Sequence, residues 1–223
     1  MKKVTKVPKE LITSLYDSRA LVVGQKRLRH DGVETFFDLR LRDPIFRTPA
    51  VRERVAKLYH TALDQHYQTP DGVREYAIIG VSMSLAPIVG IVGYLAKCPI
   101  VAIVPETRSE NQLLRIIGNP IPGCRYAMID DTIMTGQTIS QALERWVRQG
   151  FPIDLILAFC DRQEGGIPYI KKAITRLSRE VGIKLEVTIR CLTTRKEMLD
   201  TLKDEGLLSI ADHRRGMKGA IAA

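Results

Sequence analysis

The chain has few aromatic residues and few cysteines. Only 6% of its 223 residues are Phe, Trp or Tyr, so the sequence offers no clear stacking platform for nucleic-acid bases. The four cysteines are far apart and lack metal-ligand spacing, which disfavours a zinc site or a disulfide framework. We expect free thiols at Cys98, Cys124, Cys160 and Cys191.

Long apolar runs are also missing. No run approaches the roughly 20 residues that a membrane-spanning helix needs. No apolar signal-peptide core follows the opening Met1-Lys2-Lys3. The sequence therefore predicts a soluble cytoplasmic protein that does not enter a membrane. Its length is enough to bury a sizeable core as a single domain, 1–223.

Positive charge is in excess. The sequence has 34 Lys and Arg residues against 25 Asp and Glu residues, a formal net charge of +9. Lys2-Lys3 and Arg214-Arg215 could contact nucleic-acid phosphates. A substrate that carries several phosphates explains the sign equally well, and many such charges are simply solvated helix faces. Because aromatic residues are scarce, we do not expect a nucleic-acid partner.

The hydrophobic pattern predicts an N-terminal hood segment, 1–45. It contains a helix at 8–20, a basic and turn-rich stretch at 24–32, and a short strand at 36–39. The residues after Gly206 lack periodicity and are expected to form a loosely held tail, 206–223.

Between them, residues 46–205 alternate between strand and helix patterns. The order is helix 49–67, strand 76–81, helix 86–96, strand 100–104, polar loop 105–112, strand 126–129, helix 138–148, strand 153–160, helix 168–181, strand 185–191 and helix 194–205. Repeated strand–helix units predict an α/β fold with a mainly parallel sheet covered on both faces.

An apolar strand that ends in two acids and enters a small-residue turn occupies 126–138. Asp130 and Asp131 should lie at the carboxyl end of the strand, where open α/β sheets bind ligands. Two carboxylates can hold the vicinal hydroxyls of a ribose, directly or through Mg²⁺. The backbone N–H groups and hydroxyls of Thr135, Gly136 and Thr138 can bind a phosphate monoester. The alternative is that these residues only cap an ordinary βα turn.

At these residues the chain resembles the phosphoribosyl pyrophosphate (PRPP) motif of type I phosphoribosyltransferases. Both have four mostly apolar residues, an acidic pair and a Thr-Gly-x-Thr loop, although Thr132 and Met134 replace an aliphatic and a small residue. The resemblance implies that Asp130 and Asp131 hold the ribose and that Mg²⁺ is bound mainly through substrate, with help from one of them. It also implies a 5′-phosphate site at Thr135, Gly136, Gln137 and Thr138.

The run Asp161-Arg162-Gln163-Glu164-Gly165-Gly166 narrows the resemblance to orotate phosphoribosyltransferases. In that family the arginine contacts the pyrimidine, and a guanidinium fork can bind carboxylate and carbonyl oxygens in one plane. The alternative is that Arg162 pairs with Glu164 at a loop surface.

Three further segments follow the same family. Phe36 and Phe37 stand where an aromatic strand lies against the base, although core packing explains them equally well. Arg29 falls at the place of a phosphate-binding lysine. The run 80–87 is similar to the pyrophosphate loop, which implies pyrophosphate contacts at Ser82, Met83 and Ser84.

The expected lid, 104–111, departs from the family. The family reads approximately Arg-Lys-Glu-x-Lys-x-His-Gly, whereas this chain reads Val-Pro-Glu-Thr-Arg-Ser-Glu-Asn and keeps only Glu106 and one cation, Arg108. Losing a hydrogen-bond donor that stabilises transition-state charge can lower the catalytic rate about a hundredfold or more. The resemblance therefore implies an enzyme whose activity could be reduced. It also implies that Arg108 is the remaining lid cation.

The resemblance as a whole implies Mg²⁺-dependent conversion of PRPP and orotate to orotidine 5′-phosphate and pyrophosphate, in a homodimer with shared sites. Three alternatives stay open. They are a phosphoribosyltransferase for another base, a regulator that binds PRPP or nucleotide and uses its basic surface on RNA, and a degenerate scaffold subunit.

Overall fold

The computed structural model describes residues 6–28, 33–69, 72–73, 75–81, 85–105 and 114–218. Its centre is a six-stranded sheet with the strand order β10-β9-β8-β5-β6-β7. All neighbouring strands are parallel except β7, which pairs antiparallel with β6 at one edge. The strands are β5 (Tyr76–Gly80), β6 (Ile100–Pro105), β7 (Leu114–Ile117), β8 (Arg125–Ile133), β9 (Leu155–Asp161) and β10 (Thr188–Thr194). The predicted, mainly parallel sheet is confirmed.

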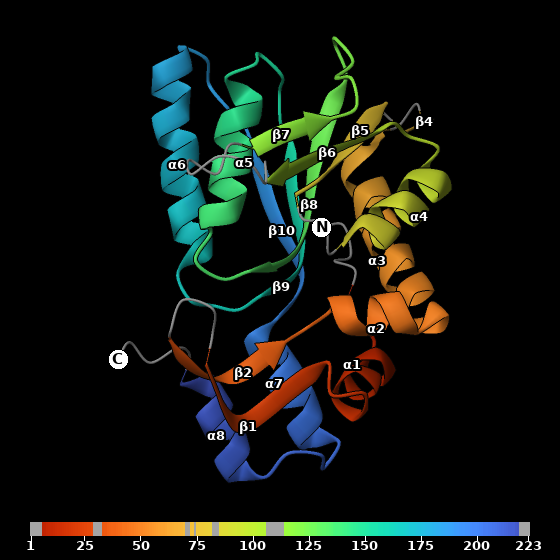
Figure 1. Ribbon diagram of the computed structural model, residues 1–223, viewed down its shortest axis with the longest axis vertical. Helices are drawn as coiled ribbons and strands as arrows, with labels where there is room; N and C mark the ends of the chain where they lie inside the picture. The colour runs from red at the N-terminus through yellow and green to blue at the C-terminus, as the bar shows by residue number, and fades with distance from the viewer. Residues whose placement is uncertain are drawn as a thin grey trace.

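Helices cover both faces of this sheet (Figure 1). One face packs against α3 (Pro49–Tyr67) and α4 (Ala86–Ala96), and the other against α5 (Gln137–Val147) and α6 (Gly166–Val181). Because both faces are buried, the central strands are nearly continuous apolar runs. The helices α3 and α4 have the bounds that the sequence predicts.

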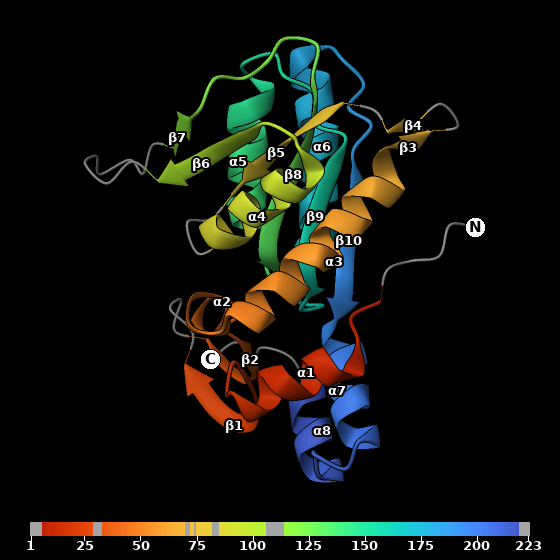
Figure 2. The same cartoon turned by 90° about the vertical axis from the view of Figure 1, so that its right-hand side faces the viewer.

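A smaller unit lies beyond the carboxyl ends of the parallel strands (Figures 1 and 2). Its centre is an antiparallel hairpin of β1 (Leu21–Leu28) and β2 (Glu34–Leu39). The helices α1 (Lys9–Asp17), α2 (Arg42–Arg47), α7 (Arg195–Asp204) and α8 (Ile210–Met217) surround it. Two short strands, β3 (Gln68–Thr69) and β4 (Gly72–Val73), form a separate pair.

The segment after Gly206 differs from the expectation. Helix α8 begins after Ser209, whose hydroxyl accepts a hydrogen bond from the N–H of Asp212, and it packs against β1, β2 and α7. Gly216 is buried so closely that a Cβ there would lie 2.9 Å from Val23 Cγ1. The prediction of a loosely held tail is therefore wrong for 210–217, because a helix this short shows too little of the 3.6-residue period to be recognised.

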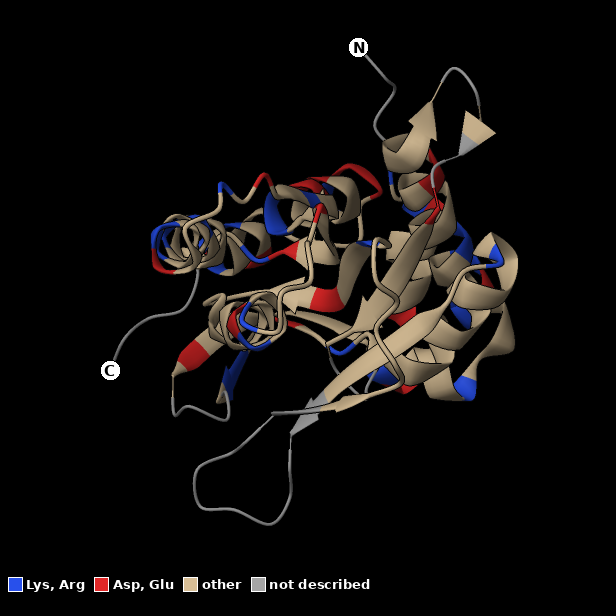
Figure 3. Ribbon diagram, turned by 90° about the horizontal axis from the view of Figure 1, so that it is seen from above, with Lys and Arg blue, Asp and Glu red and all other residues tan. Residues whose placement is uncertain are grey.

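Charged residues lie mainly on the peripheral elements. In Figure 3, Lys and Arg residues alternate with Asp and Glu residues on the outer helices, while the central strands are mostly uncharged. Arg148, for example, pairs with both Glu144 and Glu180. Within the described residues, none of the helices combines the length and the apolar character needed to cross a membrane.

Candidate active site

Two adjacent carboxylates lie at the end of the continuous buried run of β8. Asp130 is only 5% exposed, whereas Asp131 is partly exposed and lines two neighbouring cavities. The Asp130 Oδ1 atom accepts a 3.0 Å hydrogen bond from the N–H of Asp131, and the Asp131 Oδ1 atom accepts one of 2.7 Å from Thr132. From α3, the Tyr59 hydroxyl donates to the Asp130 carbonyl at 2.7 Å. Backbone and core contacts thus hold both acids at the carboxyl end of the parallel strands.

The environment of these acids disfavours their charge. Burial raises the pKa of Asp130 well above its ordinary value, and the neighbouring charge of Asp131 raises it further. Burial also raises the pKa of Asp131, although the hydrogen bond from the N–H of Thr132 opposes that shift. A hydroxyl or a cation of a ligand would stabilise the ionised pair, as expected at a functional site.

The smaller cavity, of about 210 Å³, lies where β8 turns into α5. Thr135, Gly136 and Thr138 line it together with the acidic pair. Gln137 is the first residue of α5 and does not line the cavity. Since the first-turn N–H groups of a helix lack intrahelical partners, this end of α5 suits an anion. The structure thus gathers three of the four predicted phosphate residues around one space.

A close backbone contact sets the shape of this turn. Gly136 adopts φ +80°, and a Cβ on it would lie 2.6 Å from the carbonyl oxygen of Gly166. A Cβ on Gly166 would in turn lie 2.5 Å from the carbonyl oxygen of Met134. Nearby, the N–H of Arg162 donates to the Ile133 carbonyl at 2.9 Å. These contacts hold the loops after β8 and β9 together.

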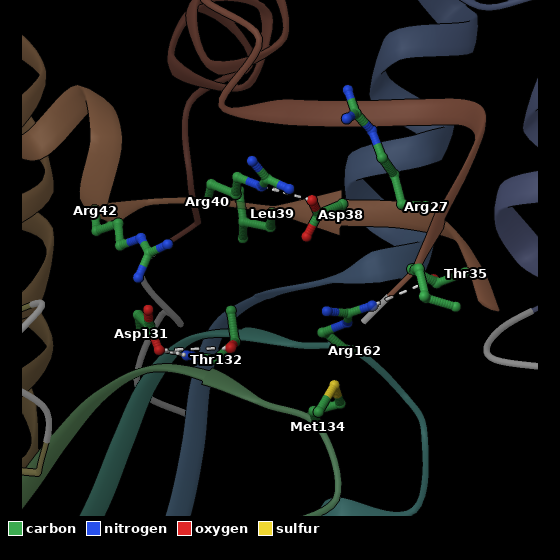
Figure 4. Close-up of a pocket in the computed structure, with 11 residues that line it drawn as sticks. Arg27, Thr35, Asp38, Leu39, Arg40, Arg42, Asp131, Thr132, Met134 and Arg162 are labelled. Carbon is green, nitrogen blue, oxygen red and sulfur yellow. Dashed lines mark hydrogen bonds and ion pairs between the residues drawn. The ribbon is translucent and has the colours of Figure 1, made fainter. Parts of the chain in front are cut away.

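The larger cavity, of about 410 Å³, lies between the β1–β2 hairpin and the ends of β8 and β9 (Figure 4). It shares Asp131, Thr132 and Met134 with the smaller cavity, so the two spaces adjoin. Most of its other side chains come from the hairpin and the segment that leads into α2. Four of the residues that line this cavity are arginines. The remaining lining residues are Arg27, Leu28, Thr35, Asp38, Leu39, Arg40, Arg42 and Arg162.

Arg162 joins the hairpin to the sheet. Its Nη2 atom donates to the Phe37 carbonyl at 2.7 Å and to Thr35 Oγ1 at 3.3 Å, and its Nε atom donates to Glu164 Oε1 at 3.2 Å. Its Nη1 atom donates no hydrogen bond within the described part of the chain. The predicted alternative, a pair with Glu164, is therefore present. It does not lie on a loop surface, because Arg162 is only 5% exposed and lines the cavity.

The two predicted aromatic residues do not line either cavity. Phe37 is fully buried in the core, with its ring centroid 5.7 Å from the guanidinium carbon of Arg162. Phe36 is partly exposed on the opposite side of β2. For Phe37 the core-packing alternative describes the structure, and the cavity wall is built instead by Thr35, Asp38 and Leu39 of the same strand.

Some predicted residues cannot be placed. Arg29, the pyrophosphate residues Ser82, Met83 and Ser84, and the lid cation Arg108 lie outside the described residues. Conversely, the sequence did not single out Arg27 of β1, Arg40 of the link after β2 and Arg42 of α2, which all line the cavity. Their only signal was the run of arginines around the predicted strand.

The donor set limits how Mg²⁺ could bind. Among the described residues, no group of three or more His, Cys, Asp or Glu side chains is arranged to hold a metal ion. Asp131 offers one accessible carboxylate, whereas Asp130 is almost fully buried. Because Mg²⁺ commonly uses one or two carboxylates together with substrate oxygens and water, the site fits an ion held mainly by substrate.

The sequence is similar to those of curated orotate phosphoribosyltransferases. No family model matches the sequence. The orotate phosphoribosyltransferase of Pyrobaculum aerophilum is 24% identical over 203 residues, which cover 91% of this chain and 97% of the relative. That of Natronomonas pharaonis is 24% identical over 157 residues, covering 70% and 83%.

Solved structures show the same architecture. The UMP synthase of Leishmania donovani superposes with a TM-score of 0.72 at 19% identity, covering 94% of this chain and 41% of that longer chain. The orotate phosphoribosyltransferase of Aeropyrum pernix gives a TM-score of 0.66 at 21% identity, covering 89% and 99%. The chain therefore has the fold of the type I phosphoribosyltransferases, and the curated relatives to which its sequence is similar are orotate phosphoribosyltransferases.

Proposed function

We propose that this chain transfers a phosphoribosyl group between PRPP and orotate in the presence of Mg²⁺. The observation that carries the proposal is the pair of adjoining cavities that share Asp131, Thr132 and Met134. The smaller cavity suits a phosphate, and the larger cavity presents the guanidinium of Arg162 to a planar anion. A ribose between the two would lie against Asp130 and Asp131. The similarity to orotate phosphoribosyltransferases supports this assignment.

The residues around the smaller cavity would bind the ribose phosphate. Thr135, Thr138 and the first N–H groups of α5 would donate to the 5′-phosphate, while Asp130 and Asp131 would accept hydrogen bonds from the ribose hydroxyls. As the bond from the anomeric carbon to pyrophosphate breaks, positive charge builds on the ribose, and the two carboxylates stabilise it. When bound, Mg²⁺ would supply charge neutralisation at the departing pyrophosphate.

Arg162 would orient the pyrimidine. Its Nη1 atom donates no hydrogen bond to the described residues, while its Nε and Nη2 atoms hold the side chain in place. The ring nitrogen of orotate then forms a bond to the anomeric carbon on the face opposite to pyrophosphate, and its N–H proton passes to pyrophosphate or water. Pyrophosphate leaves with the electron pair of the broken C–O bond. No protein nucleophile is required, because positioning and electrostatics provide the catalysis.

A spectrophotometric assay of orotate consumption with PRPP and Mg²⁺ tests the proposal. We expect loss of orotate together with release of pyrophosphate. Product formation with a purine or uracil but not with orotate would overturn the base assignment. No product with any base, together with strongly salt-dependent RNA binding, would favour a regulator instead.

The proposal includes a homodimer in which Arg108, outside the described residues, acts as a lid cation. Mixing Arg108→Ala chains with inactive Asp131→Asn chains tests whether the lid acts on the neighbouring subunit. Recovered activity in verified heterodimers would support shared sites. No recovery would show that Arg108 acts within its own chain.

A further inference from the structure

A buried cluster of three charged side chains lies beside the larger cavity. Arg162 and Arg195 both approach the Oε1 atom of Glu164, from 3.2 Å through Nε and from 3.6 Å through Nη1. The side chains of Arg162, Glu164 and Arg195 are each only 7% exposed. Two guanidinium groups thus share one carboxylate where solvent screens them poorly.

The surroundings of Arg195 are unfavourable for its charge and for its hydrogen-bond donors. It is the first residue of α7, and a cation is unfavourable at the positive end of a helix dipole. Its Nε and Nη1 atoms are buried without a hydrogen-bond partner in the described chain. Burial lowers its pKa, while the charge of Glu164 opposes that shift. Packing or hydrogen bonding alone therefore gives little reason for an arginine here.

The charge balance of the cluster gives a reason. Glu164 alone would cancel the charge of Arg162, leaving a neutral pair at the cavity wall. With Arg195 present, the three groups carry a net charge of about +1, and only Arg162 of the three lines the cavity. Asp161, the last residue of β9, also interacts electrostatically with Arg195, and its Oδ1 atom accepts from the N–H of Gln163 at 2.8 Å. Its charge is the same with and without Arg195.

We propose that Arg195 is a positioning residue that sets the preference of the larger cavity for a carboxylated planar ligand. The positive charge of Arg195 balances the negative charge of Glu164. Glu164 can then orient the guanidinium of Arg162 without cancelling the attraction of Arg162 for an anion. A second contact couples the two segments, because the Gln163 Oε1 atom accepts a 3.0 Å hydrogen bond from the N–H of Lys196 at the start of α7. The inference rests on the proposed function in taking orotate as the ligand.

A double-variant cycle separates this role from a structural one. Arg195→Met leaves a neutral cluster, Glu164→Gln gives a charge of about +2, and the double variant returns it to about +1. We expect Arg195→Met to weaken orotate binding about tenfold with little change for PRPP, and the double variant to recover most of that loss. Glu164→Gln should bind orotate at least as tightly as the parent, and Arg195→Lys, which keeps the charge, should stay near it.

The matched control is Arg176→Met, because Arg176 is an exposed arginine paired with Glu144. Its orotate affinity should equal that of the parent. A double variant that binds orotate more weakly than either single variant would show a packing role and overturn the proposal. Equal orotate affinity in Arg195→Met and the parent would overturn it as well.

A second measurement keeps this inference separate from the proposed function. Titrations with benzoate and benzamide, followed at the ¹⁵N Nε–H resonance of Arg162, need no turnover. Tighter benzoate binding by the parent and the double variant than by Arg195→Met would support the charge role even if orotate is never consumed. Equal benzoate binding by all three chains would overturn it, and failure of orotate consumption alone would overturn only the proposed function.

Discussion

Replacing Gly136 by alanine should damage the turn at 135–138, the proposed phosphate site, more than the left-handed conformation alone explains. Gly136 has φ +80°, and its new Cβ would lie 2.6 Å from the Gly166 carbonyl oxygen and 3.0 Å from Ile170 Cγ1. The nearest obstacle is backbone, which cannot turn away as the end of a flexible side chain can. The loop would have to move away from α6, and the cavity would change with it.

Two other glycines separate the contributions. Gly150 has φ +83°, but a Cβ there would have no atom within 4 Å, so Gly150→Ala carries the conformational cost alone, about 1–2 kcal/mol. Gly166 lacks a positive φ but is equally crowded, so Gly166→Ala carries the overlap alone, about 1–3 kcal/mol. Gly136→Ala should combine both and destabilise the protein by about 2–5 kcal/mol.

Urea denaturation of the three variants measures these differences, and calorimetry measures their PRPP affinity. We expect Gly136→Ala to lose the most stability and to bind PRPP poorly, whereas Gly150→Ala should bind it normally. If Gly136→Ala were no less stable than Gly150→Ala and bound PRPP as the parent does, the contact between the turn and α6 would not constrain the site.

Three further predictions concern the charged side chains. Asp131→Asn should weaken PRPP binding about 10- to 100-fold, the scale of a lost charge-assisted hydrogen bond, with little loss of thermal stability; unchanged affinity by calorimetry would contradict the ribose-holding role. Arg162→Ala should reduce orotate affinity more than PRPP affinity and lower stability by about 1–3 kcal/mol, because it leaves the buried Phe37 carbonyl without this donor; equal losses for both substrates would argue against the assignment. Burial raises the pKa of Asp130 in the folded protein above its ordinary 3.8, so ionisation of Asp130 opposes folding at higher pH. Ligand-free Asp130→Asn should therefore melt at a higher temperature than the parent at about pH 8, by ~2–4 °C for each kcal/mol of folding free energy gained, and the difference should vanish near pH 4. A melting difference that does not depend on pH would contradict this reasoning.

The sequence predicted the parts of the fold that repeat a clear pattern. In α3 the apolar residues recur at helical spacing, and β9 is a continuous apolar run, so their positions follow from local sequence. The turn at 135–138 was recognisable for the same reason, since the strand, acids, turn and helix are adjacent in the chain. The sequence did not show the distant contact with Gly166, which sets the shape of the turn.

Elements whose pattern is short or interrupted were missed. In β1, Gly24 has φ +78° and the pairing register shifts between Val23 and Arg27, so the alternation expected of a strand is broken. Helices α2 and α8 are short, and β7 is a brief antiparallel edge strand. For such segments tertiary packing decides the structure, and local sequence carries little of that information.

The arginines of the site show the same limit. The chain has 34 Lys and Arg residues. Nothing in the local sequence distinguishes the buried Arg195, or the exposed Arg42 that lines the cavity, from the others. Arg42 reaches the cavity because α2 follows the hairpin, and Arg195 is buried because α7 begins beside the loop after β9. The order in which strands and helices pack selects these cations, so sequence alone could not identify them.

The packing of α8 against β1 also bears on how the site is made during protein synthesis. The hairpin that walls the larger cavity leaves the ribosome early, but the helix that covers it is translated only after all six strands of the sheet. Until residues 210–217 emerge, Val23 lacks the contact that Gly216 provides. The nascent chain can therefore assemble its sheet and the turn at 135–138 before α8 packs against the hairpin.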